Sequence, residues 1–144
     1  QEAVLCAIGA GRQGRIRSEG TRNIILAMKN TGVRRLICQS TLGVGDSQGN
    51  LNFFWKHIMF GFFLRKAFED HIMQENHVVQ SGLDWTIVRP AAFTDGNRTG
   101  NYRHGFPGSD TTIDLKIARA DVADFMLKQL SDNTYLLRRP GLSY

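Results

Sequence analysis

Three glycines follow the first apolar run of the chain at a spacing that could bind phosphate. Residues 3–8 read Ala-Val-Leu-Cys-Ala-Ile, and Gly9, Gly11 and Gly14 then form the pattern G-x-G-x-x-G. In dinucleotide-binding proteins such glycines let the backbone approach a pyrophosphate at the start of a helix. That chemistry also needs an acidic residue at the end of the next strand, about 20 residues further on, to bind the ribose. Here the next strand ends in Cys38-Gln39-Ser40-Thr41, which contains no acid.

The glycine pattern therefore has two interpretations. In the first, Gly9–Gly14 is a true phosphate loop at the start of the fold. In the second, it is the loop after a later strand of the same kind of sheet. Such a loop still contacts a cofactor, because the carboxyl ends of the central parallel strands meet at one crevice.

Apolar runs and helical patterns alternate along the chain. Strands are predicted at 3–8, 35–39 and 85–89, with short ones near 111–114 and 134–137, and helices at 18–30, 64–80 and 120–130. Ser18 is a candidate cap for the first helix, and Phe68, Ile72 and Val79 are expected to face inward from the second. Asp70 and Glu75 on that second helix are expected to be surface charges. This alternation predicts an α/β fold, a doubly wound parallel sheet covered by helices on both faces.

Length and composition fit a single domain spanning residues 1–144. The formal charge is +5, but the basic residues are scattered, so a nucleic-acid partner is not expected. Cys6 and Cys38 each lie in an apolar run, which suggests buried reduced thiols in a cytoplasmic protein. The apolar segment Phe53–Leu64 is 12 residues long, shorter than the roughly 20 that span a bilayer, so no membrane partner is expected.

Several stretches in a fixed order resemble the atypical short-chain dehydrogenases. They are Glu19-Gly20-Thr21-Arg22-Asn23-Ile24, Gly32-Val33-Arg34-Arg35-Leu36-Ile37, Gln39-Ser40-Thr41, Ser81-Gly82-Leu83-Asp84-Trp85-Thr86-Ile87-Val88-Arg89-Pro90 and Ala118-Arg119-Ala120-Asp121-Val122-Ala123. The chain looks most like the NAD(P)H-binding group that includes NmrA-like proteins and biliverdin-IXβ/flavin reductases. The resemblance implies a Rossmann-like fold and NADP or NAD as cofactor.

The same resemblance fixes a register that favours the second interpretation of the glycines. It places Ala3–Ile8 at the fourth strand of the family fold, so that the first three strands and their own glycine-rich turn would precede Gln1. The Rossmann-like fold is then incomplete at the N-terminus, and the choice between NAD and NADP cannot be read from this chain. The first strand would have an open edge, which suggests a homodimer or pairing across that edge.

The resemblance also suggests which residues form the site. It places Ser40 at the family's active-site serine, with Thr41 beside it, and the segment Pro90-Ala91-Ala92-Phe93 along the nicotinamide, near Gly9. The Tyr-x-x-x-Lys pair of the superfamily is replaced by Ala67-Phe68-Glu69-Asp70-His71. His71 is therefore a candidate either for orienting the cofactor ribose or for supplying protons near neutral pH. Alternatively, Ser40 only closes a turn and His71 is only a half-buried helix residue.

The functional expectation is an NAD(P)H-dependent oxidoreductase that transfers hydride to a planar small-molecule acceptor such as a flavin or quinone. The missing Tyr-Lys pair favours this over alcohol dehydrogenation. The alternative is a non-catalytic NAD(P)(H)-binding redox sensor of NmrA-like type. The histidines have no metal-like spacing, so no metal site is expected. The aromatic residues of 53–63 are candidates for core, subunit interface or a substrate lid.

Overall fold

The computed structural model describes residues 2–144, and its frame is a mainly parallel sheet in the order β1-β2-β3-β7-β5. The strands are β1 (Ala3–Cys6), β2 (Arg35–Gln39), β3 (Asp84–Pro90), β7 (Gly141–Ser143) and β5 (Arg103–His104). Neighbouring strands run parallel except β5, which pairs antiparallel with β7. A separate two-stranded parallel sheet joins β4 (Ala92–Thr94) to β6 (Lys116–Ala118).

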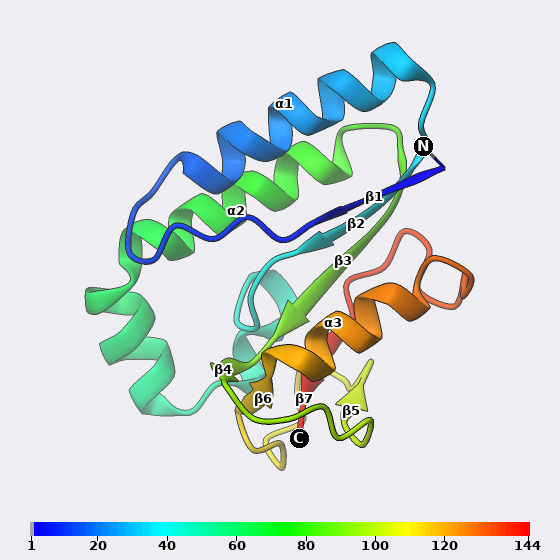
Figure 1. Ribbon diagram of the computed structural model, residues 1–144. Coiled ribbons are helices and arrows are strands. Elements are labelled where there is room, and N and C mark those ends of the chain that lie inside the picture. Colours follow the sequence, from blue (N-terminus) through cyan, green and yellow to red (C-terminus); the bar gives the residue numbers. More distant parts are fainter. Residues whose placement is uncertain (1) are drawn as a thin grey trace.

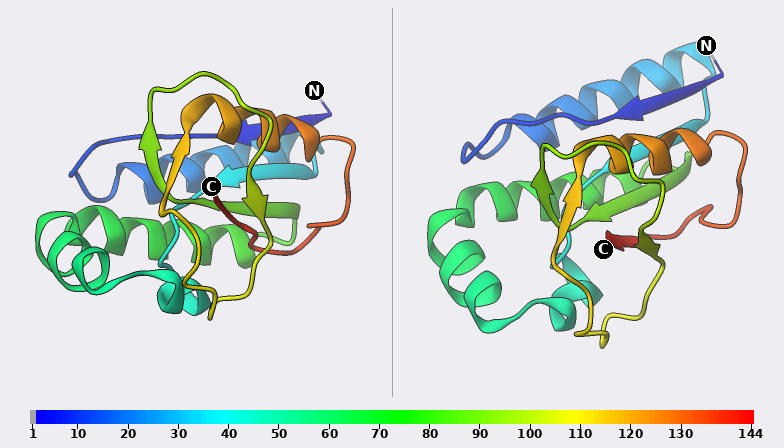
Figure 2. Two further views of the ribbon diagram at one scale, coloured as in Figure 1. Left: turned by 90° about the horizontal axis from the view of Figure 1, so that it is seen from below. Right: turned by 60° about the horizontal axis from the view of Figure 1, so that its bottom comes forward.

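Helices cover both faces of this sheet, as the alternating pattern predicts. Helices α1 (Ile16–Thr31) and α2 (Arg65–Val79) lie side by side on one face, and α3 (Arg119–Lys128) lies on the other (Figures 1 and 2). Between β2 and α2 the chain forms a 3₁₀ segment, η1 (Gly45–Asn50), and a π-helix, η2 (Phe54–Phe63). The predicted α/β fold is therefore confirmed.

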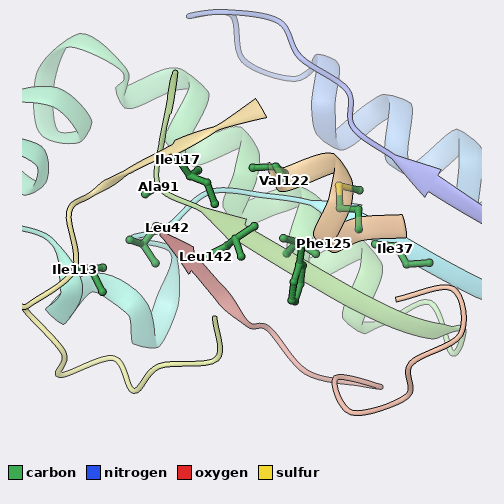
Figure 3. Packing of buried hydrophobic residues seen from close by; sticks show 10 residues of the cluster. Ile37, Leu42, Ala91, Ile113, Ile117, Val122, Phe125 and Leu142 are labelled. Atoms are coloured by element: carbon green, nitrogen blue, oxygen red, sulfur yellow. The ribbon is translucent and has the colours of Figure 1, made fainter. Parts of the chain in front are cut away.

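Alternate residues of the strands point to opposite faces of the sheet and pack into two separate hydrophobic cores. Leu36, Cys38 and Ile87 face α1 and α2, where they pack with Ile25, Met28 and Val78. Ile37, Val88 and Leu142 face α3, where they pack with Val122, Phe125 and Met126 (Figure 3). Side chains alternate between the two faces of a strand, so a strand covered on both sides is apolar throughout. The cysteines Cys6 and Cys38 are buried free thiols, as the sequence indicated.

Several predicted elements need correction. The segment 111–114 is not a strand, and the strand near it is β6 at Lys116–Ala118. Residues 134–137 form turns, and the last strand is β7, which lies between β3 and β5 instead of at an edge. β1 is shorter than predicted and lies at the edge of the sheet, so Leu5 is 38% exposed instead of buried on both faces.

The inward face of α2 is polar, which the apolar pattern did not predict. Ile72 and Val79 are exposed, whereas Asp70 is buried against the start of α1, and Gln74 and Glu75 are buried beside the sheet. The expectation that Asp70 and Glu75 are surface charges is therefore wrong. Both carboxylates are paired with arginines, Asp70 with Arg17 and Glu75 with Arg89, and this pairing is what makes their burial tolerable.

Candidate active site

The carboxyl ends of β1, β2 and β3 open into a cleft of about 390 Å³. The cleft is lined by every residue that the sequence analysis predicted for the site, namely Gly9, Ser40, Thr41, His71, Pro90, Ala91, Ala92 and Phe93. Ligand sites of open parallel sheets lie at this end of the strands. The fold thus brings together residues separated by more than 80 positions in the sequence, but their shared location does not by itself establish the role of each.

Ser40 is buried and held by a charged network. Its hydroxyl donates to Glu75 Oε1 at 2.7 Å, and its N–H donates to the Val88 carbonyl of β3 at 2.8 Å. Arg89 fixes Glu75 in turn, with Nε and Nη2 at 3.0 and 2.8 Å from its two carboxylate oxygens. Because the Ser40 hydroxyl donates its hydrogen bond to Glu75, the Ser40 oxygen can accept a hydrogen bond from a ligand N–H. Arg89 also contacts Asp46 of η1 at 2.5 Å.

His71 is held in one orientation and stays uncharged. Its Nδ1 lies 3.0 Å from Gln74 Oε1, and the Gln74 amide nitrogen donates to Thr21 and Cys38. Gln74 Oε1 must therefore accept, which places the imidazole proton on Nδ1 and leaves Nε2 as an acceptor. Burial, aided by the positive charge of Arg17, lowers the pKa of His71 to about 4. A neutral ring of this kind suits the ribose-orienting role better than the supply of protons near neutral pH.

The segment after β3 forms a small-residue wall with one aromatic ring. Ala91 is buried, and Phe93 is 40% exposed. The guanidinium of Arg119 lies 5.1 Å from the Phe93 ring centroid and also pairs with Asp95. One face of the Phe93 ring is therefore occupied by a cation, and only its other face is left for a flat ligand.

The opposite wall comes from η2 and the segment that precedes it. Trp55, Phe60 and Leu64 contribute apolar surface to the cleft, together with Leu51. Phe60 stacks on Phe68 of α2, with ring centroids 4.7 Å apart. The aromatic segment therefore forms part of the cleft itself, an arrangement closer to the lid alternative than to a buried core.

The first turn of α1 decides between the two interpretations of the glycines. In a phosphate loop the free N–H groups at the helix start bind the pyrophosphate. Here two of these N–H groups already have a partner in Asp70 of α2. The Asp70 carboxylate accepts from the N–H of Arg17 at 2.9 Å and from the N–H of Ser18 at 3.1 Å. Ser18 does not cap the helix as predicted, because the N-cap position is Arg15 and the Ser18 hydroxyl donates to Asp70.

The glycines themselves have structural explanations. A Cβ on Gly14 would lie 3.1 Å from the Lys66 carbonyl oxygen, so glycine lets the loop approach the start of α2. Gly11 has φ +54°, a conformation that glycine adopts most readily. Arg17 then closes the loop by donating to the carbonyls of Gly11 and Gln13. A Cβ on Gly9 would meet nothing within 4 Å, since Gly9 borders the open cleft. The second interpretation, a loop after a later strand, fits these contacts.

Comparison with known proteins agrees with this geometry. The model of the NAD(P)H-binding family matches residues 1–133. The chain belongs to that NAD(P)H-binding family. Solved structures of other proteins share its fold.

Three of these structures show the shared fold. A short-chain dehydrogenase/reductase from Veillonella parvula, solved with NADP, is 20% identical with a TM-score of 0.76, over 99% of this chain and 63% of that one. The anaerobillin reductase ChuY from Escherichia coli O157:H7 is 23% identical with a TM-score of 0.74, over 98% and 63%. The oxidoreductase YlbE from Lactococcus lactis is 18% identical with a TM-score of 0.78, over 99% and 61%. The chain thus spans less than two thirds of their length.

The residues of this NAD(P)H-binding domain fit one end of a dinucleotide. Ala91 and Ala92 leave room for a flat ring, and His71 Nε2 and the Ser40 oxygen are acceptors beside that room. A second hollow of about 540 Å³ continues past Gly9 and Gln39 towards Gly11 and α3. The two hollows share Gly9, Gln39 and Phe93 in their linings, so they adjoin each other and form one groove. Arg17 and Arg119 line both hollows, and each is paired with an aspartate, Asp70 and Asp95 respectively.

Sequence reasoning missed the buried charges that hold this site. Glu75 and Gln74 orient Ser40 and His71, yet each looks like an ordinary polar helix residue in the sequence. One usable signal was present: Asp70 and Gln74 are four residues apart, which is the spacing of a single helix face. Arg89 in an otherwise apolar strand was the matching signal, since its guanidinium pairs with Glu75.

Proposed function

We propose that this chain is the catalytic part of an NAD(P)H-dependent oxidoreductase that transfers hydride to a planar acceptor such as a flavin or quinone. One observation carries the proposal. The cleft is lined by small residues after β3, by two fixed acceptors, Ser40 after β2 and His71 on α2, and by apolar aromatic residues of η2. A narrow site of this kind holds two flat rings against each other and excludes water, which is what hydride transfer needs from a protein.

The chain's own residues have distinct parts in this scheme. A bound reduced nicotinamide supplies the hydride. The Ser40 oxygen accepts from its carboxamide N–H, and Glu75 keeps the serine hydroxyl turned so that it can only accept. His71 Nε2 accepts from a ribose hydroxyl, while Gln74 fixes the ring. Trp55 and Phe60 contact the acceptor ring. No proton donor of the Tyr-Lys kind faces the cleft among its lining residues, which favours acceptors that take a proton from water after reduction.

The preferred acceptor and the cellular location are part of the same proposal. A flavin-reductase-like activity is preferred over the NmrA-like sensor because the cleft has room for a second ring beside the nicotinamide. A cytoplasmic location is supported by Cys6 and Cys38, which are close in space on adjacent strands and yet unbonded.

Turnover of reduced cofactor tests the proposal directly. The chain is mixed with NADPH or NADH and with menadione or FMN, and nicotinamide oxidation is followed by absorbance. Acceptor-dependent oxidation is expected. Tight cofactor binding without oxidation by any planar acceptor would instead identify the redox sensor.

Ser40→Ala refines the test. The lost hydrogen bond is expected to weaken NADPH binding by about tenfold. Ser81→Ala is the matched control, because Ser81 is a buried serine whose hydroxyl bonds only to the turn after α2. Equal cofactor affinity in the Ser40 and Ser81 variants would remove Ser40 from the site.

A further inference from the structure

The π-helix η2 is apolar on two sides, and only one of them faces protein. Trp55, Phe60 and Leu64 recur at intervals of four to five residues and line the cleft. Phe54, Ile58 and Phe62 recur at the same interval on another side. A π-helix with i→i+5 hydrogen bonds, such as the Leu64 N–H to Met59 carbonyl bond here, places residues at that interval one above another.

The second side has no covering element in the described chain. Phe54 is 50% exposed, Ile58 39%, Phe62 77% and Phe63 47%, and Phe53 just before the helix is 73% exposed. Figure 1 shows η2 at the periphery, beyond the end of the sheet and beside the loop that follows β1. Exposed apolar side chains that form a continuous stripe usually mark a surface for association.

The charges around this stripe are of one sign. No acidic residue occurs between Asp46 and Glu69, a span that contains Lys56, Arg65 and Lys66. The loop after β1 adds Arg12, whose guanidinium lies 5.8 Å from the Phe63 ring centroid. Arg12, Lys56 and Lys66 are exposed and make no ion pair with any residue of 2–144. The aromatic stripe therefore has Arg12, Lys56 and Lys66 beside it as basic residues without an ion pair in residues 2–144, whereas Arg65 pairs with Glu69.

We propose that this stripe, Phe53, Phe54, Ile58, Phe62 and Phe63, seats the protein on the surface of an anionic phospholipid bilayer. Aromatic side chains favour the boundary between acyl chains and headgroups, and lysines and arginines at its edge attract anionic lipid. No helix in residues 2–144 is long and apolar enough to cross a bilayer, so the contact is with one leaflet. The proposal departs from the sequence-based expectation of no membrane partner, and it stands apart from the proposed redox activity.

A second copy of the chain fits the stripe less well. A twofold interface would place the same patch on both subunits and bring each copy's Arg12, Lys56 and Lys66 close to those of the other. A bilayer rich in phosphatidylglycerol has the opposite charge to this patch. Charge complementarity therefore selects the lipid.

Vesicle co-sedimentation with the whole chain tests the proposal. Vesicles of phosphatidylcholine alone are compared with equimolar phosphatidylcholine and phosphatidylglycerol. Binding to the anionic vesicles is expected to be at least about tenfold tighter, since each basic residue near the surface contributes roughly a factor of five. High salt is expected to weaken that preference.

Paired variants separate the aromatic and basic contributions. The double variant Phe54→Ser with Phe62→Ser is expected to lose binding to both vesicle types. Leu127→Ser, which changes a 57% exposed leucine of α3, is its control. Lys56→Gln with Lys66→Gln is expected to remove only the preference for anionic vesicles, and Lys29→Gln at the far end of α1 should leave it intact.

Circular dichroism establishes that each variant is folded before binding is compared. Equal binding of both vesicle types by the unmodified chain would overturn the proposal, as would anionic binding that survives the double serine change. A dimer in sedimentation equilibrium that the serine changes dissolve would assign the stripe to a second copy and would also overturn it.

Discussion

The carboxylate of Asp70, on α2, lies 2.5 Å from the hydroxyl of Ser18, on α1, and accepts the N–H of the same residue. It also accepts the N–H of Arg17 and faces that residue's guanidinium at 3.6 Å. One side chain of α2 therefore satisfies two of the open N–H groups at the start of α1, where the N-cap residue Arg15 makes no side-chain capping bond. It joins the two helices that cover one face of the sheet.

Asp70→Asn is expected to destabilise the fold by about 2 kcal/mol, because an amide cannot accept from all these donors at once. Urea unfolding measures the difference. Glu69→Gln changes the neighbouring exposed carboxylate, which pairs with Arg65, and should cost less than about 0.5 kcal/mol. Similar losses in the two variants would contradict the capping role.

The same substitution has a pH signature. Although burial favours its neutral form, the hydrogen bonds from Ser18 and the N–H groups, with the charge of Arg17, lower the pKa of Asp70 below 3.8. A lowered carboxyl pKa means stability that is present above the unfolded-state value and is lost as pH falls through the folded value. Unfolding of the Asp70→Asn variant should therefore depend less on pH in this acidic range than unfolding of the unmodified chain.

His71 should titrate far from the physiological range. Its pKa of about 4 lies below the ordinary value of 6.5, so the folded protein resists protonation of the ring. The resulting contribution to stability is complete above pH 6.5 and is lost as pH falls towards 4. Proton NMR of the His71 ring measures the pKa directly, and His71→Gln should flatten the stability profile across this window. A ring that titrates near 6.5 would restore His71 as a proton source.

Two glycines of one motif should respond differently to alanine. Gly14→Ala places a methyl group against the Lys66 carbonyl and is expected to cost about 1 kcal/mol or more in urea unfolding. Gly9→Ala meets no atom within 4 Å and should leave stability nearly unchanged, but its methyl group enters the cleft and should weaken NADPH binding. Cofactor affinity that falls only in the Gly14 variant would point back to a phosphate loop.

The free edge of β1 should pair with another strand. β1 bonds only to β2 in the described sheet, and we propose that a second copy or a further strand of the protein covers its outer edge. Sedimentation velocity should then show concentration-dependent association of this chain. Leu5→Lys should abolish it, since a charge on an edge strand opposes pairing. A chain that stays monomeric at every concentration would contradict self-pairing.

The strands and helices that bury apolar residues were predictable, and the polar supports were not. Gly32 ends α1 at φ +76°, and the Val33 N–H donates back to the Met28 carbonyl, so this cap depends on local chemistry alone. The strand Arg35–Gln39 was predicted to the residue. The inward face of α2 was not, because Asp70 and Glu75 are buried only by virtue of Arg17 and Arg89, which are distant in the sequence.

The site showed the same division. The sequence and its family resemblance located the residues that meet at the cleft, because strand ends converge in any parallel sheet of this kind. The orientation of the polar groups of Ser40 and His71 was not predictable in this way. The proton of Ser40 and the tautomer of His71 depend on Glu75 and Gln74, and nothing in the sequence connects those pairs before the chain is folded.

Asp46, Arg89, Glu75 and Ser40 form a continuous chain of two ion pairs and one hydrogen bond that starts at the surface. Asp46 has 84% of its side chain in solvent, whereas Arg89 and Glu75 are almost wholly enclosed. A residue outside the cleft lining is thus connected through two ion pairs and a hydrogen bond to Ser40, which lines the cleft. Protein engineers can therefore adjust the serine from outside, by changing the turn that carries Asp46, without altering the walls of the groove.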